Sequence, residues 1–308
     1  MQVRLLTVAS ILLFLAPAGA AETIRGTPLR VTSIYMSPDT ASNKLAEVDR
    51  GREVIILENT REWLHVEAVL TEEKIITGWI LNKGVVQGST PNGDKIVFGE
   101  AVESEDQASQ SHGRRGAAQD AMRLYYRTAE YFPTSPLAAE AMYRSADIRW
   151  QIEKADVMSR PSAKEKEAYL RASMDEQYMK EVIKKFPGTK WADLAAFHLI
   201  ENKVCGDWQG SSKCPEKEAE MYEKYVNEYP QSPAVAEALY DAAWRQSALI
   251  EMYKTEEQAK KSDESRGKAI ALAQKAVAQA PQSDWGARAQ LLLFMIEQNI
   301  PTYGNGVD

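Results

Sequence analysis

The pattern of apolar and polar positions changes once along the chain. Between residues 28 and 87, short runs rich in β-branched and aromatic residues alternate with turn residues, as at 37–39 and 49–51. This pattern predicts five strands, at 29–35, 44–48, 53–58, 63–69 and 75–80. Five short strands within about 60 residues are typical of a small antiparallel barrel.

From residue 117 onward the apolar spacing is that of helices, and no convincing strand follows. The predicted helices lie at 117–132, 135–155, 163–186, 190–204, 216–229, 233–253, 265–280 and 284–298. A turn-rich run at 87–94 separates the two parts, and the polar residues after it predict an exposed, partly helical linker. The expected division is a β domain at 21–87, a linker at 88–116, helices at 117–300 and a frayed tail at 301–308.

A proline corner recurs between the helical runs, at Pro133, Pro187, Pro230 and Pro281. Proline ends a helix because it lacks the N–H and clashes with the preceding turn. A hydroxyl residue stands two positions later and is expected to cap the next helix, as Ser135, Thr189, Ser232 and Ser283. An alanine that would let paired helices approach closely stands eight positions after each proline, as Ala141, Ala195, Ala238 and Ala289. Such helical hairpins cannot bury their apolar faces alone, so we expect them to stack into a solenoid.

The run at 225–240 resembles a tetratricopeptide repeat, and the closest variety is that of periplasmic proteins in outer-membrane assembly and Tol-associated complexes. The corners are 54, 43 and 51 residues apart, against 34 in that family, so insertions are expected between units. The resemblance implies an all-α solenoid that binds proteins or peptides on its concave face.

The strand region resembles the bacterial SH3 family. The residues that carry this resemblance are Ser37-Pro38, Gly51 before Val54, Trp63 with Val66, and Gly78-Trp79-Ile80. It implies an SH3-like barrel that binds cell-wall peptides or other envelope partners, with Tyr35, Trp63 and Trp79 as candidate contacts. The competing interpretation, which we favour, places Trp63 and Trp79 in the core of the barrel.

The first 20 residues have the features of a secretory signal peptide. Arg4 is followed by a short apolar run at 11–16 and by the small residues of a cleavage site at 18–20. We therefore expect a mature chain that begins at Ala21 or Glu22 and is periplasmic or secreted, not membrane-spanning after cleavage. The alternative is an uncleaved anchor, for which the apolar run is short.

Export changes the interpretation of the two cysteines, Cys205 and Cys214, which lie nine positions apart in a predicted loop. In an oxidising compartment such a pair predicts a disulfide. The alternatives are a metal site, which two thiols without a histidine in the loop would serve poorly, and a redox pair, which lacks the C-x-x-C spacing. We expect no metal and no cofactor.

Charge and motifs narrow the function further. The 308 residues carry 44 acidic and 37 basic side chains, a net charge of −7, which argues against nucleic acid as a partner. None of the three histidines lies in a nucleophile motif, and Glu264-Ser265 is a lone dipeptide without the rest of a lytic transglycosylase motif. The carboxylates at 216–223 have the spacing of a solvated helix face. These observations predict that the protein is not an enzyme.

The first helical unit is rich in aromatic and arginine side chains, the composition of interface hot spots. Arg123, Tyr126, Arg144 and Trp150 are therefore candidate partner contacts, although most aromatics there must pack between helices. The fold class expected is α+β multidomain, a small SH3-like β-barrel followed by an all-α tetratricopeptide-like solenoid. The function expected is a non-enzymatic exported scaffold of the bacterial cell envelope that binds envelope proteins or peptides. The alternatives are a peptidoglycan-binding protein and, ranked last, a cell-wall hydrolase.

Overall fold

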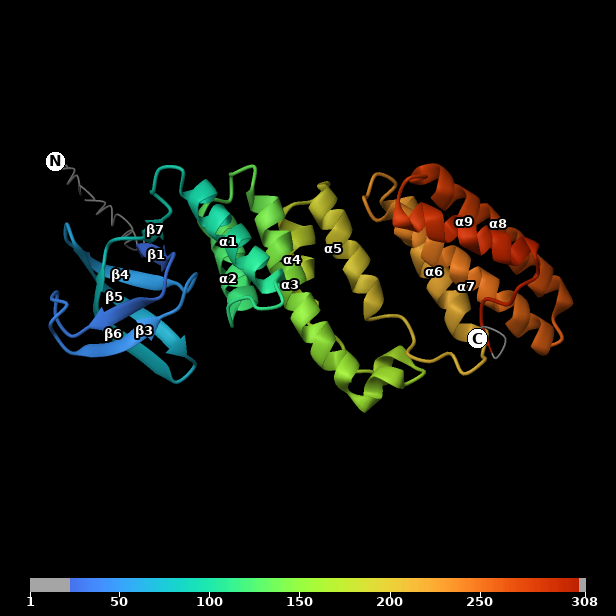
Figure 1. The fold of residues 1–308 in the computed structure, drawn as a ribbon, viewed down its shortest axis with the longest axis horizontal. Coiled ribbons are helices and arrows are strands. Elements are labelled where there is room, and N and C mark those ends of the chain that lie inside the picture. The colour runs from blue at the N-terminus through green and yellow to red at the C-terminus, as the bar shows by residue number, and fades with distance from the viewer. Residues whose placement is uncertain (1–22, 305–308) are drawn as a thin grey trace, which may run out of the picture.

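The computed structural model describes residues 23–304, so the predicted signal peptide lies outside the described residues. A curled β-sheet forms one end of the molecule, and the helices extend from it in chain order (Figure 1). The mixed α+β class is confirmed. In the described part of the chain, no helix combines the length and the apolar character needed to cross a membrane.

The sheet contains seven antiparallel strands in the order β3-β2-β6-β5-β4-β1-β7. Their bounds are Arg25–Pro28 (β1), Thr32–Tyr35 (β2), Lys44–Val48 (β3), Val54–Asn59 (β4), Trp63–Thr71 (β5), Lys74–Leu81 (β6) and Val85–Gln87 (β7). The first predicted run, at 29–35, therefore contains only β2, while β1 and β7 were not predicted. The alternation on β5 and β6 places Leu64 and Ile80 opposite each other, both fully buried in the core of the sheet.

Nine helices are present in the described chain. They are Gly93–Ser109 (α1), Ala117–Tyr131 (α2), Ala138–Ser159 (α3), Gln177–Lys185 (α4), Lys190–Glu201 (α5), Lys213–Glu228 (α6), Val235–Thr255 (α7), Ala259–Gln279 (α8) and Asp284–Glu297 (α9). The partly helical character predicted for residues 95–116 is confirmed by α1, but their exposure is wrong at Val97, Ala101 and Ser104, which α1 buries in contact with α2. These residues follow at i, i+4 and i+7, the spacing of one helix face.

The predicted helix at 163–186 is also wrong, since α4 covers only its last third. Residues 160–176 form two 3₁₀ turns, Pro161–Lys164 and Ala168–Leu170, and an extended stretch. The Asn202 side chain accepts a hydrogen bond from the Met174 N–H at 3.0 Å and donates one to its carbonyl at 2.9 Å. The Arg171 guanidinium donates to the Val204 carbonyl at 2.6 Å. Tertiary hydrogen bonds thus replace the helical ones in this segment.

The four proline corners share one backbone geometry. The residue before each proline ends its helix with φ between −148° and −127° and ψ between 52° and 67°, as Phe132, Phe186, Tyr229 and Ala280. Its N–H still bonds the carbonyl four residues earlier in each case. The four alanines of the pattern, Ala141, Ala195, Ala238 and Ala289, all have 0% exposure, so their predicted place between packed helices is confirmed.

The predicted caps are confirmed at two corners and wrong at the other two. Thr189 accepts from the Ala192 N–H, and Ser283 accepts from the Gly286 N–H. At Ser135 and Ser232 the helix begins three residues later, so the hydroxyl instead accepts from the N–H two residues on. These two serines stabilise a turn that precedes the helix.

The helices form two halves, each with its own apolar core. One core lies among α1–α5 and also contains Val86 of β7; the other lies among α5–α9. The predicted disulfide, Cys205–Cys214, is confirmed with a Cα–Cα distance of 6.1 Å. Only Cys205 lies in the loop that connects the halves, because α6 already begins at Lys213 and contains Cys214.

Candidate binding surfaces

Four ring side chains gather on the outer side of the sheet, and we call them the aromatic face: Tyr35, Trp63, His65 and Trp79. Trp79 of β6 pairs with His65 of β5 and with Tyr35 of β2. The rings of His65 and Trp79 stack at 4.8 Å, and those of Tyr35 and Trp63 meet edge to face at 5.7 Å. The structure therefore brings together the three aromatic residues that the sequence nominated, and adds a histidine.

The favoured interpretation of Trp63 and Trp79 as core residues is wrong. Both are half-buried, and neither belongs to the buried cluster of the sheet. Their neighbours Leu64 and Ile80 take the core side, because successive side chains of a strand point to opposite faces. One exposed apolar side chain lies beside the rings, since Leu81 pairs with Trp63 and remains 38% exposed.

The candidate contacts of the first helical unit do not form one surface. Trp150 is only 1% exposed and donates its indole N–H to Glu201, so its nomination as a partner contact is corrected to a core role. The Arg144 guanidinium pairs with Glu105 at 3.2 Å and lies over the Tyr125 ring. Tyr126 is half-buried and borders an open groove beside α4.

Arg123 joins the sheet to the helices. Its guanidinium bonds the Arg50 carbonyl at 2.9 Å and also pairs with Asp120 on its own helix. Gly51, next to Arg50, has φ +70°, and a Cβ there would come within 2.9 Å of the Leu124 backbone nitrogen. Only glycine fits this approach without strain, which explains a residue that the sequence marked as a turn signal.

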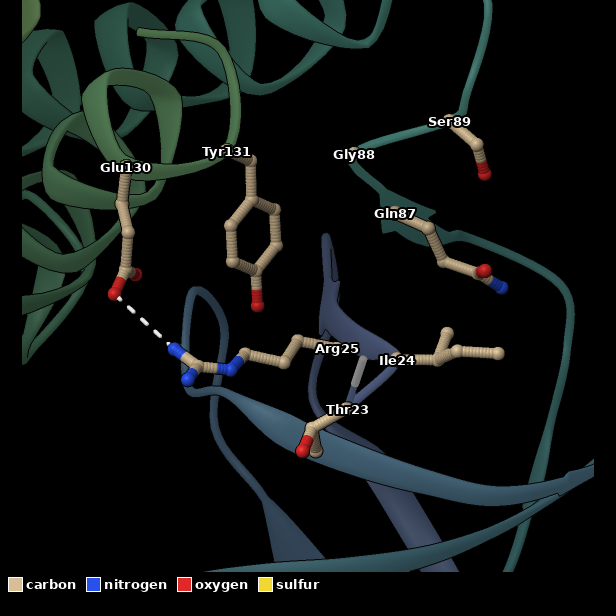
Figure 2. A pocket seen from close by; sticks show the side chains of 8 residues that line it. All are labelled: Thr23, Ile24, Arg25, Gln87, Gly88, Ser89, Glu130 and Tyr131. Carbon is tan, nitrogen blue, oxygen red and sulfur yellow. Dashed lines mark ion pairs between the residues drawn. The ribbon is translucent and has the colours of Figure 1, made fainter. Parts of the chain in front are cut away.

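An ionic cluster completes this junction. The Glu53 carboxylate forms ion pairs with Arg25 at 3.6 Å and with Arg127 at 3.5 Å, and it accepts a hydrogen bond from the Tyr131 hydroxyl at 3.3 Å. Arg25 also pairs with Glu130 at 3.6 Å. A pocket of about 480 Å³ lies at this place. Figure 2 shows its lining, with the Tyr131 ring and the Arg25–Glu130 pair on its wall. Thr23 on its rim is the first residue that the structure describes, and none of the candidate contacts lines it.

The disulfide loop covers a buried ion pair. Trp208 of the loop is 6% exposed, lies against Trp244 at 4.9 Å and donates its indole N–H to Glu218 at 3.0 Å. Glu218 also accepts from the Cys205 N–H at 2.9 Å and from Arg245 at 2.8 Å. Glu218 is only 2% exposed, so its interpretation as part of a solvated helix face is wrong.

A cleft of about 350 Å³ is lined by residues of both helical halves, and we call it the inter-half cleft. Its lining comes from α3, α5, α6, α7 and the segments that connect them, including Cys205 and Gly206. Three of its residues are carboxylates: Glu201, Glu237 and Asp241. None of the three was a candidate from the sequence, because a cleft built by four elements leaves no local pattern.

The pKa values of the three carboxylates in the cleft are shifted in different directions. Burial alone would raise the pKa of Glu201, but hydrogen bonds from His198, Lys154 and Trp150 hold it at about 2. Burial raises the pKa of Glu237 to about 7, and the neighbouring Asp241 adds to the rise. Burial also raises the pKa of Asp241, against the opposing charge of Arg245.

No protein-family profile matches the chain, and no curated protein is similar enough to match it. Among solved structures, one described as "DHF58 filament" is 15% identical, with 68% of this chain and 94% of that chain covered and a TM-score of 0.23. The structure "DHF119 filament" is 16% identical, with 68% of this chain and 95% of that chain covered and a TM-score of 0.23. The de novo designed helical repeat protein DHR64 is 15% identical, with 67% of this chain and 92% of that chain covered and a TM-score of 0.20. Similarity at these TM-scores carries no conclusion.

Proposed function

We propose that the protein is a non-enzymatic scaffold of the bacterial cell envelope, exported by its N-terminal segment, that docks protein partners through its sheet and its helices. In this proposal the sheet is an SH3-like domain and the helical hairpins are tetratricopeptide-like repeats. The observation that carries it is the aromatic face, where Tyr35, Trp63 and Trp79 lie together outside the core.

Trp and Tyr are over-represented at protein interfaces because they bury a large area at a small cost in conformational entropy. The strands that carry the aromatic face are β2, β5 and β6. The contacts to α1 and α2 come instead from β1, the turn after it, β7 and the loop before β4. Attachment of the sheet to the helices therefore does not use the aromatic face.

The proposal is tested by capture from an envelope extract. A photoactivatable residue in place of Tyr35 is expected to crosslink a protein partner, and the crosslink should be lost with Trp63→Ala and Trp79→Ala. Tyr169→Ala is the matched control, since Tyr169 is 80% exposed on the segment between α3 and α4. An extract that gives no crosslink to any protein contradicts the proposal.

The second candidate is a peptidoglycan-binding protein that uses the same rings, since flat aromatic surfaces also suit sugar rings and short wall peptides. Co-sedimentation with purified sacculi, lost on Trp79→Ala, would favour it; wild-type protein that stays in the supernatant excludes it. A wall hydrolase ranks last. It rested on Glu264, which is an exposed residue of α8 beside Lys260, and it requires that the pure protein release muropeptides.

A further inference from the structure

We propose that the inter-half cleft binds the lysine or arginine side chain of an extended basic segment of a partner protein, with Glu237 as its counter-ion. The inference deepens the proposed function by giving the helices a ligand chemistry of their own. It concerns residues that are remote in sequence from the aromatic face and belong to other elements, α3 and α5 on one side and α6 and α7 on the other (Figure 1).

The charges of the cleft leave one carboxylate over. Lys154 pairs with Glu201 at 2.8 Å, and Arg245 pairs with both Glu218 and Asp241, at 2.8 and 3.1 Å. His198 faces Asp147 and Glu201, and Arg171 bonds the Val204 carbonyl. Among residues 23–304, no side-chain cation forms an ion pair with Glu237, although Lys154 and His198 act on it from farther away.

The walls suit the rest of a long basic side chain. The rings of Phe197 and Tyr222 lie 6.1 Å apart on the cleft, and Met158 and Met174 line it as well. A lysine or arginine packs its aliphatic stem on apolar surface and places its charged end beside carboxylates or over aromatic rings. The combination of apolar walls with one unpaired carboxylate is therefore complementary to a basic side chain.

The size of the cleft favours a peptide over a bare ion. A volume of about 350 Å³ far exceeds one cation, and it falls within the range of ligand pockets. In the described chain, no group of three or more His, Cys, Asp or Glu side chains has the arrangement of a metal site. A basic residue with its neighbours in an extended segment would fill both the charged and the apolar parts.

Binding of the cation is expected to depend on pH. Burial raises the pKa of Glu237 to about 7, so near neutrality part of the protein holds this carboxyl protonated. A cation favours the ionised form, so binding should release a proton and strengthen as the pH rises through 7. The other charged or titratable groups that line the cleft or act on Glu237 come from α3, α5, α6, α7 and the segment between α3 and α4. They are Tyr143, Lys154, Arg171, His198, Glu201, Tyr222, Tyr225, Asp241 and Arg245.

The test is calorimetric titration of the full-length mature chain with the blocked pentapeptide Gly-Leu-Lys-Leu-Gly. The matched peptide replaces lysine by norleucine, which keeps the stem and removes the charge. We expect saturable binding of the lysine peptide, at least about tenfold weaker on Glu237→Gln, and a dissociation constant that falls between pH 6 and pH 8. Glu297→Gln, an exposed position on α9, removes the same charge and should leave binding unchanged.

Each other outcome overturns the inference. These are no saturable binding of the lysine peptide, equal binding of the norleucine peptide, or equal affinity of Glu237→Gln and wild type. Spermidine that binds as tightly as the peptide overturns the assignment to a protein segment. The aromatic face is tested with different variants and a different readout, so failure here leaves the result for Tyr35, Trp63 and Trp79 standing, and the converse also holds.

Discussion

The two long connections of the helical region are fastened by different chemistry. Residues 160–176, between α3 and α4, are held by hydrogen bonds: Asn202 bonds both backbone groups of Met174 and the Glu176 carboxylate, and Arg171 bonds the Val204 carbonyl. Residues 202–212, between α5 and α6, are held by a disulfide, a buried tryptophan and the Glu218–Arg245 pair. One helical architecture thus holds its two insertions in different ways. Removing one partner of the buried Glu218–Arg245 pair should destabilise the protein more than removing the Asn202 hydrogen bonds.

The largest effect is expected from Arg245→Ala. This change leaves Glu218 buried with two N–H donors but without its cation, which should destabilise the second half by about 3–5 kcal/mol. Hydrogen exchange measured by mass spectrometry should show faster exchange in α6 and α7 and little change in α2 and α3. If hydrogen exchange becomes faster by the same factor in both helical halves, the Glu218–Arg245 pair stabilises the whole helical region and not only the second half.

Replacing both Cys205 and Cys214 by serine is expected to rank next. The disulfide closes a loop of about ten residues, and the loss of that constraint should cost about 2–3 kcal/mol. The midpoint of urea unfolding should fall and should match that of the wild-type chain measured with reductant. A double variant as stable as the oxidised wild type would show that Trp208 and the ion pair alone hold the loop.

Asn202→Ala is expected to cost less, about 1–2 kcal/mol, because it removes three hydrogen bonds at a partly buried site, two to the Met174 backbone and one to the Glu176 carboxylate, and no buried charge loses its ion-pair partner. Hydrogen exchange should rise in residues 171–176 and should stay unchanged in the disulfide loop. An effect as large as that of Arg245→Ala would contradict the distinction between the two connections.

The smallest effects come from the corners. Ser283→Ala removes a helix cap and should cost about 1 kcal/mol, measured as a loss of stability in urea unfolding. Ser135→Ala removes a bond within the turn before α3 and a bond to Asp94, and it should leave the first turn of α3 as protected as before. If α3 frays in Ser135→Ala as much as α9 frays in Ser283→Ala, Ser135 also acts as a helix cap and the distinction between the two corners is wrong.

The features that the sequence predicted correctly are periodic or local. The helix ends at the four prolines, the four buried alanines and the disulfide each depend on residues close in the chain. The errors arise where distant residues decide. The Asn202 amide competes with a helix at residue 174, and Arg245 makes Glu218 a buried residue on a helix that looks solvated.

The candidate sites divide in the same way. Tyr35, Trp63 and Trp79 could be nominated because strands show their pattern in the sequence, but which side of the sheet they take depends on its curvature. Trp150 could not be separated from a surface aromatic, since its burial and its bond to Glu201 depend on α5. Glu237 has no local signature in the sequence. It can be recognised as a carboxylate without an ion-pair partner only when the three-dimensional structure shows which carboxylates Lys154 and Arg245 contact.

Gly51 has a consequence for the angle between the sheet and the helices. It lies so close to α2 that a Cβ at position 51 would stand 2.9 Å from both the Cβ of Arg123 and the backbone nitrogen of Leu124. A larger residue there would have to push the sheet away from α2. We expect such a substitution to change the orientation of the sheet relative to the helices, and with it the direction in which the aromatic face points.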